Sequence, residues 1–325
     1  MLNDALIAAV NSQPSTGWSD AVLNDALIAA VNSQPSTGWT AHRSPRFEGL
    51  SLNDAKSLLG VLDDVPSASS TSSYVKQPRT GRTPTDFDCR TQWPTCVHPI
   101  RDQGSCGGCW AFGASEVLSD RFCIASSGAS KAGVLSPQDL ISCDIGKYTF
   151  GCEGGVPEYA WKYLTQTGIA TDVCMPYIGN STEACPLACV ASAPAGTPFT
   201  KFKAIDGSVR MLSDSQGAIQ QAMVGGPGQG PGGPVQADFY VYQDFFAYKS
   251  GIYSCPTNST LKPLGRHSVK IVGYGMLKTN TSVVDYWIVA NSWGPKWGDD
   301  GFFKIAAGKE TCQIDTQMIF GQADV

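Results

Sequence analysis

An amphipathic helical pattern occurs twice near the start of the chain. Leu2–Trp18 and Leu23–Trp39 share the identical sequence LNDALIAAVNSQPSTGW. Apolar residues such as Leu2, Leu6 and Val10 recur at helical spacing, so we predict one helix in each copy. Asn and Asp at the start suit a cap, and Ser-Gln-Pro-Ser-Thr-Gly ends the helix. Two copies are too few for a solenoid. We interpret the first copy as redundant, the product of a local duplication or of sequence assembly.

A second, shorter helix and a linker follow. Ser51 with Asp54 three residues later is a variant of the capping box, which predicts a helix to about Leu59. Residues 66–85 are rich in Ser, Thr, Pro and Gly and carry three exposed basic residues. Such a segment cannot bury a core, and it is a natural site for proteolytic cleavage.

The rest of the chain divides into a helical part followed by a β part. Apolar spacing from Trp110 to about Gly168 is helical and includes a helix at Pro157–Thr167. From about Phe199 onward, β-branched and aromatic residues alternate between glycine turns. We therefore predict an α+β fold. The glycine-rich stretch Gly225–Pro234 is expected to form a flexible surface loop.

Composition narrows the class of protein. The chain has 325 residues, a formal net charge of −5 and no cluster of basic residues, which argues against a nucleic-acid partner. No run of 18 apolar residues is present, so we expect no membrane span. Twelve cysteines favour an oxidising compartment, and glycosylation sequons at Asn180, Asn258 and Asn280 agree with it. The start at Met1 lacks the pattern of a signal peptide, so we expect one to lie outside this chain.

Cys109 is the candidate nucleophile. It lies in Gln103–Phe112, QGSCGGCWAF, where two glycines lead into a cysteine and a helix-compatible run follows to Arg121. A cysteine at the start of a helix lies at the positive end of the helix dipole, which favours the reactive thiolate. The Gln103 side-chain amide, with the Cys109 N–H, could bind the oxyanion formed when the sulfur attacks a carbonyl group.

The chain offers three histidines as candidate bases. His267 begins a predicted strand, and the next predicted strand ends with Asn291 and Trp293. His98 is interpreted as a solvated surface histidine, and His42 lies in the N-terminal extension. Cys106 and Cys109 also form a Cys-x-x-Cys pair. A redox motif would need a surrounding βαβ pattern, and a zinc site would need a second ligand pair, so neither use is favoured.

Cys109, His267 and Asn291, in this order and each in its own motif, resemble the papain family of cysteine peptidases. The segments RDQGSC, SDR, YKSG and WGDDGFF are similar to cathepsin B. Gly108 departs from the family signature Cys-Gly-[Ser/Ala]-Cys-[Trp/Tyr]. The resemblance implies a two-lobe fold with a cleft between a helical lobe, about 100–190, and a β-barrel lobe, about 191–310. It also implies a helical propeptide, 1–83, before a peptidase domain, 84–325.

The resemblance also assigns roles to residues. Cys109 would attack, His267 would transfer the proton, Asn291 would orient His267, and Gln103 would stabilise the oxyanion. Trp293 would cover the bond between His267 and Asn291. The other residues implied in substrate binding are Gly154, Gly155, Pro157, Asp238 and Gln317. Gln317 replaces a glutamate that accepts basic P2 side chains in mammalian cathepsin B, so we expect an apolar P2 preference unless Asp238 restores a charge.

The disulfide pairs implied by the resemblance are Cys96–Cys123, Cys106–Cys152, Cys143–Cys185 and Cys174–Cys189. Cys312 matches a family position that is usually unpaired. Cys89 with Cys255 would form an additional bridge. Between Cys174 and Cys185 lie ten residues without histidine, where cathepsin B carries the histidine-containing occluding loop.

The chain is therefore expected to be a cysteine endopeptidase zymogen, lysosomal, vacuolar or secreted, with a thiolate–imidazolium pair at rest. A non-catalytic, disulfide-rich secreted binding protein on the same fold is the alternative. A thiol oxidoreductase is the second rival. We expect protein and peptide substrates, inhibition by the chain's own propeptide and by cystatin-type or epoxide inhibitors, a monomer, and no cofactor or metal.

Overall fold

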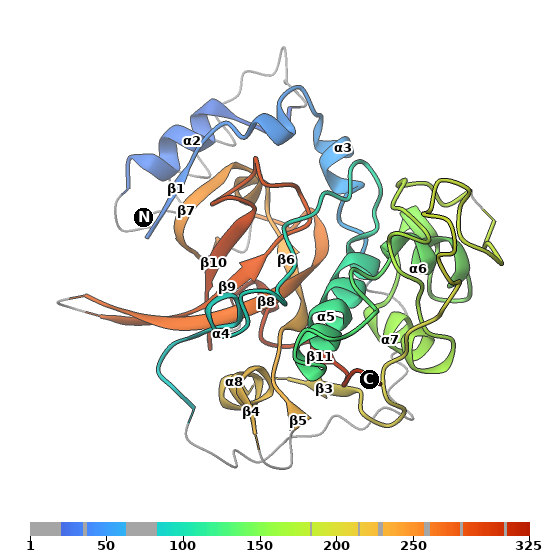
Figure 1. The fold of residues 1–325 in the computed structure, drawn as a ribbon. Helices are drawn as coiled ribbons and strands as arrows, with labels where there is room; N and C mark the ends of the chain where they lie inside the picture. The colour runs from blue at the N-terminus through green and yellow to red at the C-terminus, as the bar shows by residue number, and fades with distance from the viewer. Residues whose placement is uncertain are drawn as a thin grey trace.

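A helical lobe and a β-sheet lobe pack against each other, and the N-terminal segment crosses over both (Figure 1). The computed structural model describes residues 21–34, 38–62, 83–182, 184–213, 215–226, 230–256, 261–279, 282–308 and 311–325. The first copy of the duplicated segment and most of the predicted linker lie outside these ranges. The predicted α+β architecture with two lobes is confirmed.

The helical lobe is organised around α5, Cys109–Ala125. All residues from 109 to 122 are buried, so this helix has no solvent-facing stripe there and forms part of the core itself. It extends four residues beyond the predicted end at Arg121. The other helices after residue 83 are α4, Cys89–Gln92; α6, Pro137–Cys143; η3, Gly151–Glu153; α7, Pro157–Gln166; α8, Gln216–Val224; η4, Gln243–Ala247; and η5, Thr311–Gln313.

The β-sheet lobe contains a nine-stranded sheet in the order β1-β7-β10-β9-β8-β6-β11-β3, with β2 paired to β8. Its pairings are antiparallel except that of β10 with β7. Residues 266–275 of β8 are buried where α5 packs against this strand. The strands are β1, Trp39–Ala41; β2, Phe87–Asp88; β3, Arg210–Leu212; β6, Val235–Val241; β7, Tyr248–Tyr253; β8, Gly265–Lys278; β9, Val283–Ala290; β10, Phe302–Ala306; and β11, Met318–Phe320.

The N-terminal segment folds as α2, Asp25–Asn32; β1; η2, Pro45–Phe47; and α3, Leu52–Lys56. Asn24 caps α2, because its side chain accepts hydrogen bonds from two backbone N–H groups of the first turn. The predicted capping box of Ser51 and Asp54 is also present, although α3 ends three residues before Leu59. β1 pairs with the edge strand β7 of the main sheet. The second copy of the duplicated segment therefore forms the predicted helix, and its last residue, Trp39, begins a strand that joins the sheet.

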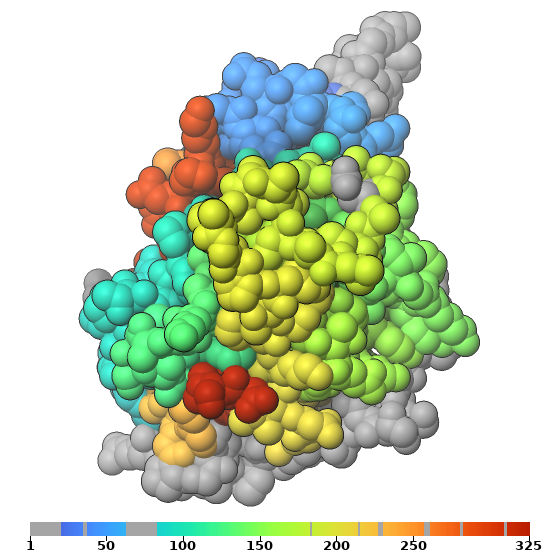
Figure 2. Space-filling model, turned by 45° about the vertical axis from the view of Figure 1, so that its right-hand side comes forward, coloured from blue at the N-terminus to red at the C-terminus, as the bar shows by residue number. Residues whose placement is uncertain are grey.

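Between α7 and β3 the described residues form no regular helix or strand. They appear as a yellow-green to yellow layer over the helical lobe, below the blue N-terminal segment (Figure 2). Two disulfides, Cys143–Cys185 and Cys174–Cys189, hold this layer together and attach it to α6. Within the described ranges, no helix combines the length and apolarity needed to cross a membrane.

The structure forms the four disulfide pairs that the resemblance implied, together with a fifth. The fifth joins Cys255 to Cys312, so the expectation of an unpaired Cys312 and of a Cys89–Cys255 bridge was wrong. Cys255 follows β7 and Cys312 lies in η5, with their Cα atoms 5.5 Å apart. Cys89 is a buried free thiol at the start of α4.

The glycine-rich stretch is more ordered than expected. β4, Gly225–Gly226, and β5, Gly230–Pro231, form a small antiparallel pair around residues 227–229, which lie outside the described ranges. Residues 232–234 are buried, because the Arg121 side chain enters this region and donates hydrogen bonds to the carbonyl oxygens of Gly233 and Pro234. Part of the predicted surface loop therefore anchors the end of α5.

Candidate functional site

Cys109 is the first residue of α5 and is fully buried. The loop before it must pass close to other backbone, which explains its glycines. A Cβ on Gly107 would lie 2.5 Å from the Cys152 carbonyl oxygen. The Cys106–Cys152 disulfide fixes the same contact. The sulfur of Cys109 is therefore held at the positive end of a long helix.

His267 and Asn291 come together from neighbouring strands. His267 lies near the start of β8 and Asn291 directly after β9, and His267 Nε2 is 2.8 Å from Asn291 Oδ1. The amide oxygen can only accept, so Nε2 carries the proton and Nδ1 is the nitrogen left for proton exchange. The Trp293 ring lies 4.7 Å from the His267 ring, and both are buried. Trp293 therefore packs against His267 at the place that the resemblance implied for it.

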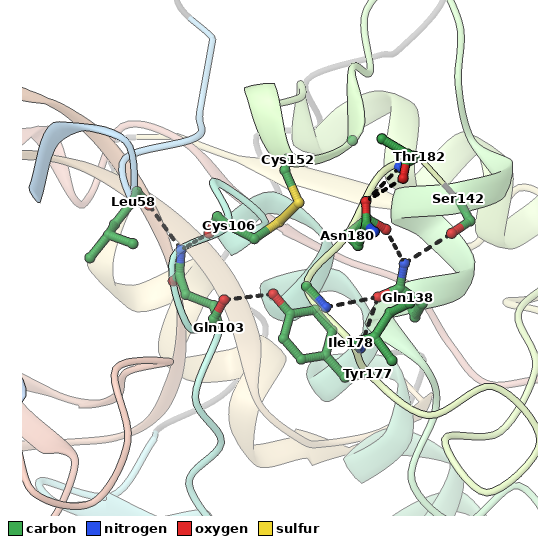
Figure 3. The surroundings of a disulfide bond; sticks show 12 residues. Leu58, Gln103, Cys106, Gln138, Ser142, Cys152, Tyr177, Ile178, Asn180 and Thr182 are labelled. Atoms are coloured by element: carbon green, nitrogen blue, oxygen red, sulfur yellow. Dashed lines mark hydrogen bonds between the residues drawn. A yellow bond between two sulfur atoms is a disulfide. The ribbon is translucent and has the colours of Figure 1, made fainter. Parts of the chain in front are cut away.

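Gln103 is held by several contacts (Figure 3). Its Nε2 donates to the carbonyl oxygens of Leu58, at 3.0 Å, and Cys106, at 2.8 Å. Its Oε1 accepts a hydrogen bond of 2.7 Å from Ser292 Oγ, which fixes the orientation of the amide. The backbone oxygen of Gln103 accepts a hydrogen bond of 2.6 Å from Tyr177 Oη. Both hydrogen bonds that the Gln103 side-chain amide donates in this covered structure therefore go to backbone carbonyl oxygens.

The N-terminal segment crosses the site as an extended backbone. Gly60 N lies 3.3 Å from Cys109 Sγ. Gly155 N donates to Gly60 O at 2.8 Å, and Leu62 N donates to Gly155 O at 3.3 Å. On the β-sheet side, Val61 N donates to the carbonyl oxygen of Arg266 at 3.3 Å. Both lobes therefore hydrogen-bond the same stretch of backbone over the nucleophile.

Glycines on both sides allow this close approach. A Cβ on Gly60 would lie 1.8 Å from the Gly107 carbonyl oxygen. Gly154, which has a φ of +115°, would place a Cβ 2.9 Å from the Gly60 carbonyl oxygen. The structure therefore gives Gly154 and Gly155 the position expected of residues that bind an extended chain, here the N-terminal segment.

Aromatic and charged contacts fasten the same segment outside the cleft. Phe47 packs edge-on against Trp293, with ring centroids 5.1 Å apart. Trp39 packs against Tyr253 at 5.1 Å. Arg46 Nη2 donates to Asp102 Oδ1 and to the Gly104 carbonyl oxygen. The cover over Cys109 is therefore continuous with a docking surface on the β-sheet lobe.

Burial under this segment sets the charge state of the site. It raises the pKa of the Cys109 thiol to about 12 and lowers the pKa of the His267 imidazole to about 4. The covered site therefore holds a neutral thiol and a neutral imidazole. This differs from the thiolate–imidazolium pair expected at rest, because the N-terminal segment excludes the water that would stabilise the two charges.

A pocket of about 70 Å³ lies beside the covered cleft. Three expected substrate-binding residues, Pro157, Asp238 and Gln317, line it together. The sequence prediction missed Arg266 and Glu158, which line the same pocket. Arg266 directly precedes His267 in β8, but consecutive strand residues face opposite sides of the sheet, so this adjacency alone does not place Arg266 in the pocket.

Residues 83–322 match the family described as "Papain family cysteine protease". The chain belongs to the papain family. It is 40% identical to a gut-specific cysteine proteinase of Caenorhabditis elegans, over 74% of each chain. It is 37% identical to cathepsin B-like CP3 of Giardia intestinalis, over 85% of this chain and 86% of the relative.

Solved structures of papain-family proenzymes share the fold. Procathepsin B S9 from Trypanosoma congolense matches with a TM-score of 0.77 and 29% identity, over 94% of this chain and 99% of that one. The match includes residues before the family domain, where the N-terminal segment covers Cys109. The match to the papain family and the match to a proenzyme structure together identify the chain as a cysteine peptidase zymogen.

Cys106, His98 and His42 lie outside the group formed by Cys109, His267 and Asn291. Cys106 is joined to Cys152, so it cannot form a dithiol with Cys109. His98, expected to be a solvated surface residue, is mostly buried, because its Nδ1 lies 2.6 Å from the buried Asp120. His42 lies in the N-terminal segment, as expected. Asn180 is exposed, whereas Asn258 and Asn280 lie outside the described ranges.

Proposed function

We propose that this zymogen yields a papain-family cysteine endopeptidase whose catalytic residues are Cys109, His267, Asn291 and Gln103. The observation that carries the proposal is the extended backbone of residues 60–62, which both lobes hydrogen-bond directly over Cys109. An extended substrate can use the same backbone groups. Residues 1–83 act as the propeptide, and the mature enzyme starts near Pro84.

In the mature enzyme, Cys109 is the thiolate and His267 carries the proton. The sulfur attacks the peptide carbonyl carbon, and the oxyanion receives hydrogen bonds from Gln103 Nε2 and the Cys109 N–H. His267 gives its proton to the leaving amine, and a thioester remains. Water attacks the thioester while His267 removes its proton, which releases the acid and restores the thiolate and imidazolium. Asn291 keeps the imidazole oriented throughout.

Substitution of the nucleophile tests the proposal. Cys109→Ala in the processed enzyme should lower hydrolysis of a fluorogenic peptide by on the order of 10⁴–10⁶, because no other group can form the thioester. Asn291→Ala should cost less, since this residue only orients the base. Labelling by an epoxide that alkylates active-site thiolates should map to Cys109. Unchanged turnover of the Cys109→Ala variant would end the proposal.

We further propose an endopeptidase with an open primed side. The segment from Cys174 to Cys185, which corresponds to the occluding loop of cathepsin B, has only ten residues between the cysteines and contains no histidine. Its disulfides and the bonds from Gln138 to residues 178–180 hold it against the helical lobe. Internal cleavage of a blocked peptide should be indifferent to C-terminal amidation. Removal of C-terminal dipeptides that amidation prevents would contradict this proposal.

The location of the enzyme follows from its cysteine chemistry. Five disulfides among the described residues fit an oxidising compartment. We propose passage through the secretory pathway to a lysosome, a vacuole or the outside of the cell. Mass spectrometry of the protein from its native source, before and after deglycosylation, tests this proposal at the exposed Asn180.

A further inference from the structure

Arg266 places a cation in the wall of the pocket beside the cleft. Its side chain is nearly buried, with the residue 7% exposed. Its Nη2 donates a hydrogen bond of 2.7 Å to Gln317 Oε1. Its guanidinium carbon lies 5.2 Å from the centre of the Tyr240 ring. The guanidinium gives this pocket a positive group of its own, with its N–H donors in a rigid planar fork.

The same pocket contains two carboxylates. Asp238 and Glu158 line it together with Arg266, and Asp238 is 4% exposed. In the pairing of β6 with β8, Tyr240 lies opposite Arg266 and Asp238 lies opposite Ser268. Asp238 is therefore the diagonal neighbour of Arg266 on the same face of the sheet, within reach of a long side chain. A buried carboxylate needs a compensating cation, and Arg266 is the basic residue in this lining.

The remaining wall is apolar. It includes Pro157, Met211, Met318 and Ile319. The N-terminal segment presents Val61 and Leu62 at this pocket, so the chain's own inhibitory segment offers it aliphatic side chains. Arg266 thus offsets one of the two carboxylate charges on the polar side of the pocket, and the apolar side remains available to a ligand.

We propose that Arg266 determines P2 specificity. Its guanidinium occupies the space next to Asp238 that the side chain of a substrate Lys or Arg would have to fill. This inference rests on the proposed peptidase function. Basic P2 side chains are excluded by charge and by volume, while Leu and Phe contact the apolar wall. Asp238 does not act as an acceptor for basic substrates while Arg266 is present.

The test compares blocked fluorogenic peptides that differ only in Leu, Arg or Glu at P2. The full chain is processed, and active sites are counted by epoxide titration, so that unfolded material does not affect the rates. Arg266→Met should raise the ratio of kcat/KM for P2-Arg over P2-Leu by at least about tenfold, the size of a gained charge-assisted hydrogen bond. The matched control is Arg210→Met, which removes an arginine outside the pocket and should leave the ratio unchanged.

A second substitution shows whether Asp238 is the group that binds a basic P2 side chain once Arg266 is removed. Asp238→Asn added to Arg266→Met should return the ratio toward that of the wild type. Where Arg266→Met does not fold, Arg266→Gln should raise the ratio in the same direction.

An unchanged ratio, or a wild-type preference for P2-Arg, overturns the inference. A wild-type preference for P2-Glu overturns it also, since Arg266 would then be free to bind an acidic substrate. Failure of the wild-type enzyme to cleave any of the peptides contradicts the proposed function itself, whereas cleavage with an unchanged ratio contradicts only the role of Arg266.

Discussion

Gly60 has no side chain at the point where the N-terminal segment passes over Cys109. Gly60→Ala should weaken inhibition by the 1–83 segment added in trans to the mature enzyme, because the new Cβ would lie 1.8 Å from the Gly107 carbonyl oxygen. Forcing the backbone apart there breaks several hydrogen bonds, and we expect the inhibition constant to rise by about 10² or more.

The matched control for Gly60→Ala is Lys56→Ala, which shortens an exposed side chain of the same segment. It should change the inhibition constant by less than about threefold, as expected for a surface substitution. Equal effects of the two substitutions would show that the close approach at Gly60 does not control binding.

Tyr177 is the residue that ties the layer over the helical lobe to the proposed oxyanion-binding residue. Its hydroxyl donates to the Gln103 backbone, and its ring packs edge-on against Phe112 at 4.7 Å. Tyr177→Phe keeps the ring and removes this hydrogen bond. We expect kcat to fall by about 2–10-fold with little change in KM, because one hydrogen bond that positions a transition-state donor is lost. A rise in KM at constant kcat would assign Tyr177 to substrate binding instead.

At the residue scale, the sequence was most informative where a short motif fixes its own geometry. Cys109 follows glycines that permit the close turn, and Asn291 ends a strand next to His267. Arg266 was missed because neighbouring residues on a strand face opposite sides. Its surroundings depend on the register of β8 with β6, which no local motif specifies. The partner of Cys312 likewise depends on where η5 lies relative to the end of β7.

At the scale of elements, α5 and β8 must hold Cys109 and His267 at a fixed separation. Lys270 of β8 points into α5, where its Nζ lies 2.7 Å from Asp120 Oδ2 and 3.5 Å from Glu116 Oε2. All three side chains are nearly or fully buried. His98 contacts Asp120 from the loop before α5. The pair of elements that carries the reaction is thus joined by a buried charged network.

Removing the cation of this network should destabilise the fold. Lys270→Met leaves the Asp120 and Glu116 carboxylates without their main partner, and breaking a buried ion pair in this way costs about 3–5 kcal/mol. The free energy of unfolding, measured with denaturant on the Cys109→Ala background, should fall by that amount. Combining Lys270→Met with Asp120→Asn should recover part of the loss. A change below about 1 kcal/mol would show that the network is not needed to hold the two elements together.

The starts of the capped helices were predictable at this scale, whereas the path of the glycine-rich stretch was not. Asn24 and Ser51 act through backbone groups two or three residues away, so their role can be read from the local sequence. The stretch from Gly225 is ordered by Arg121, which is about a hundred residues earlier in the chain. No spacing rule connects the two.

At the scale of the whole molecule, proton binding is coupled to release of the N-terminal segment. The covered His267 has a pKa of about 4, and exposure returns this pKa toward its ordinary value near 6.5. In the wild type, the proton that His267 gains on release comes from the Cys109 thiol, so none is taken up from solution. In a Cys109→Ala variant no thiol supplies this proton, and between the two pKa values the open form binds a proton that the covered form does not. Falling pH therefore favours the open form of this variant, and the effect disappears above about pH 6.5.

Binding of the 1–83 segment to the mature Cys109→Ala variant measures this coupling. The dissociation constant should rise as the pH is lowered from 6.5 to 4.5, by up to about tenfold per pH unit for one proton. A constant that is unchanged or lower at pH 4.5 would contradict the coupling.

Deletion of Leu2–Trp18 should leave inhibition in trans unchanged at every pH, because the second copy supplies α2 and the first residue of β1. Inhibition constants of residues 1–83 and of the shortened segment, measured side by side, provide the comparison. A large loss of inhibition would mean that the first copy is the one that binds.

Removal of the propeptide also changes the boundary of the sheet. While β1 is present, the backbone of Tyr248–Gly251 is paired on the side away from β10. After its departure β7 becomes an edge strand, whose free N–H and C=O groups are a template on which another chain can form β-structure. Lys249, which is exposed, and Gly251, with a φ of +93°, are the features of this strand that discourage such pairing. The N-terminal segment therefore inhibits the peptidase and also covers a strand edge that could aggregate. Activation removes the inhibition and exposes that edge in the same step.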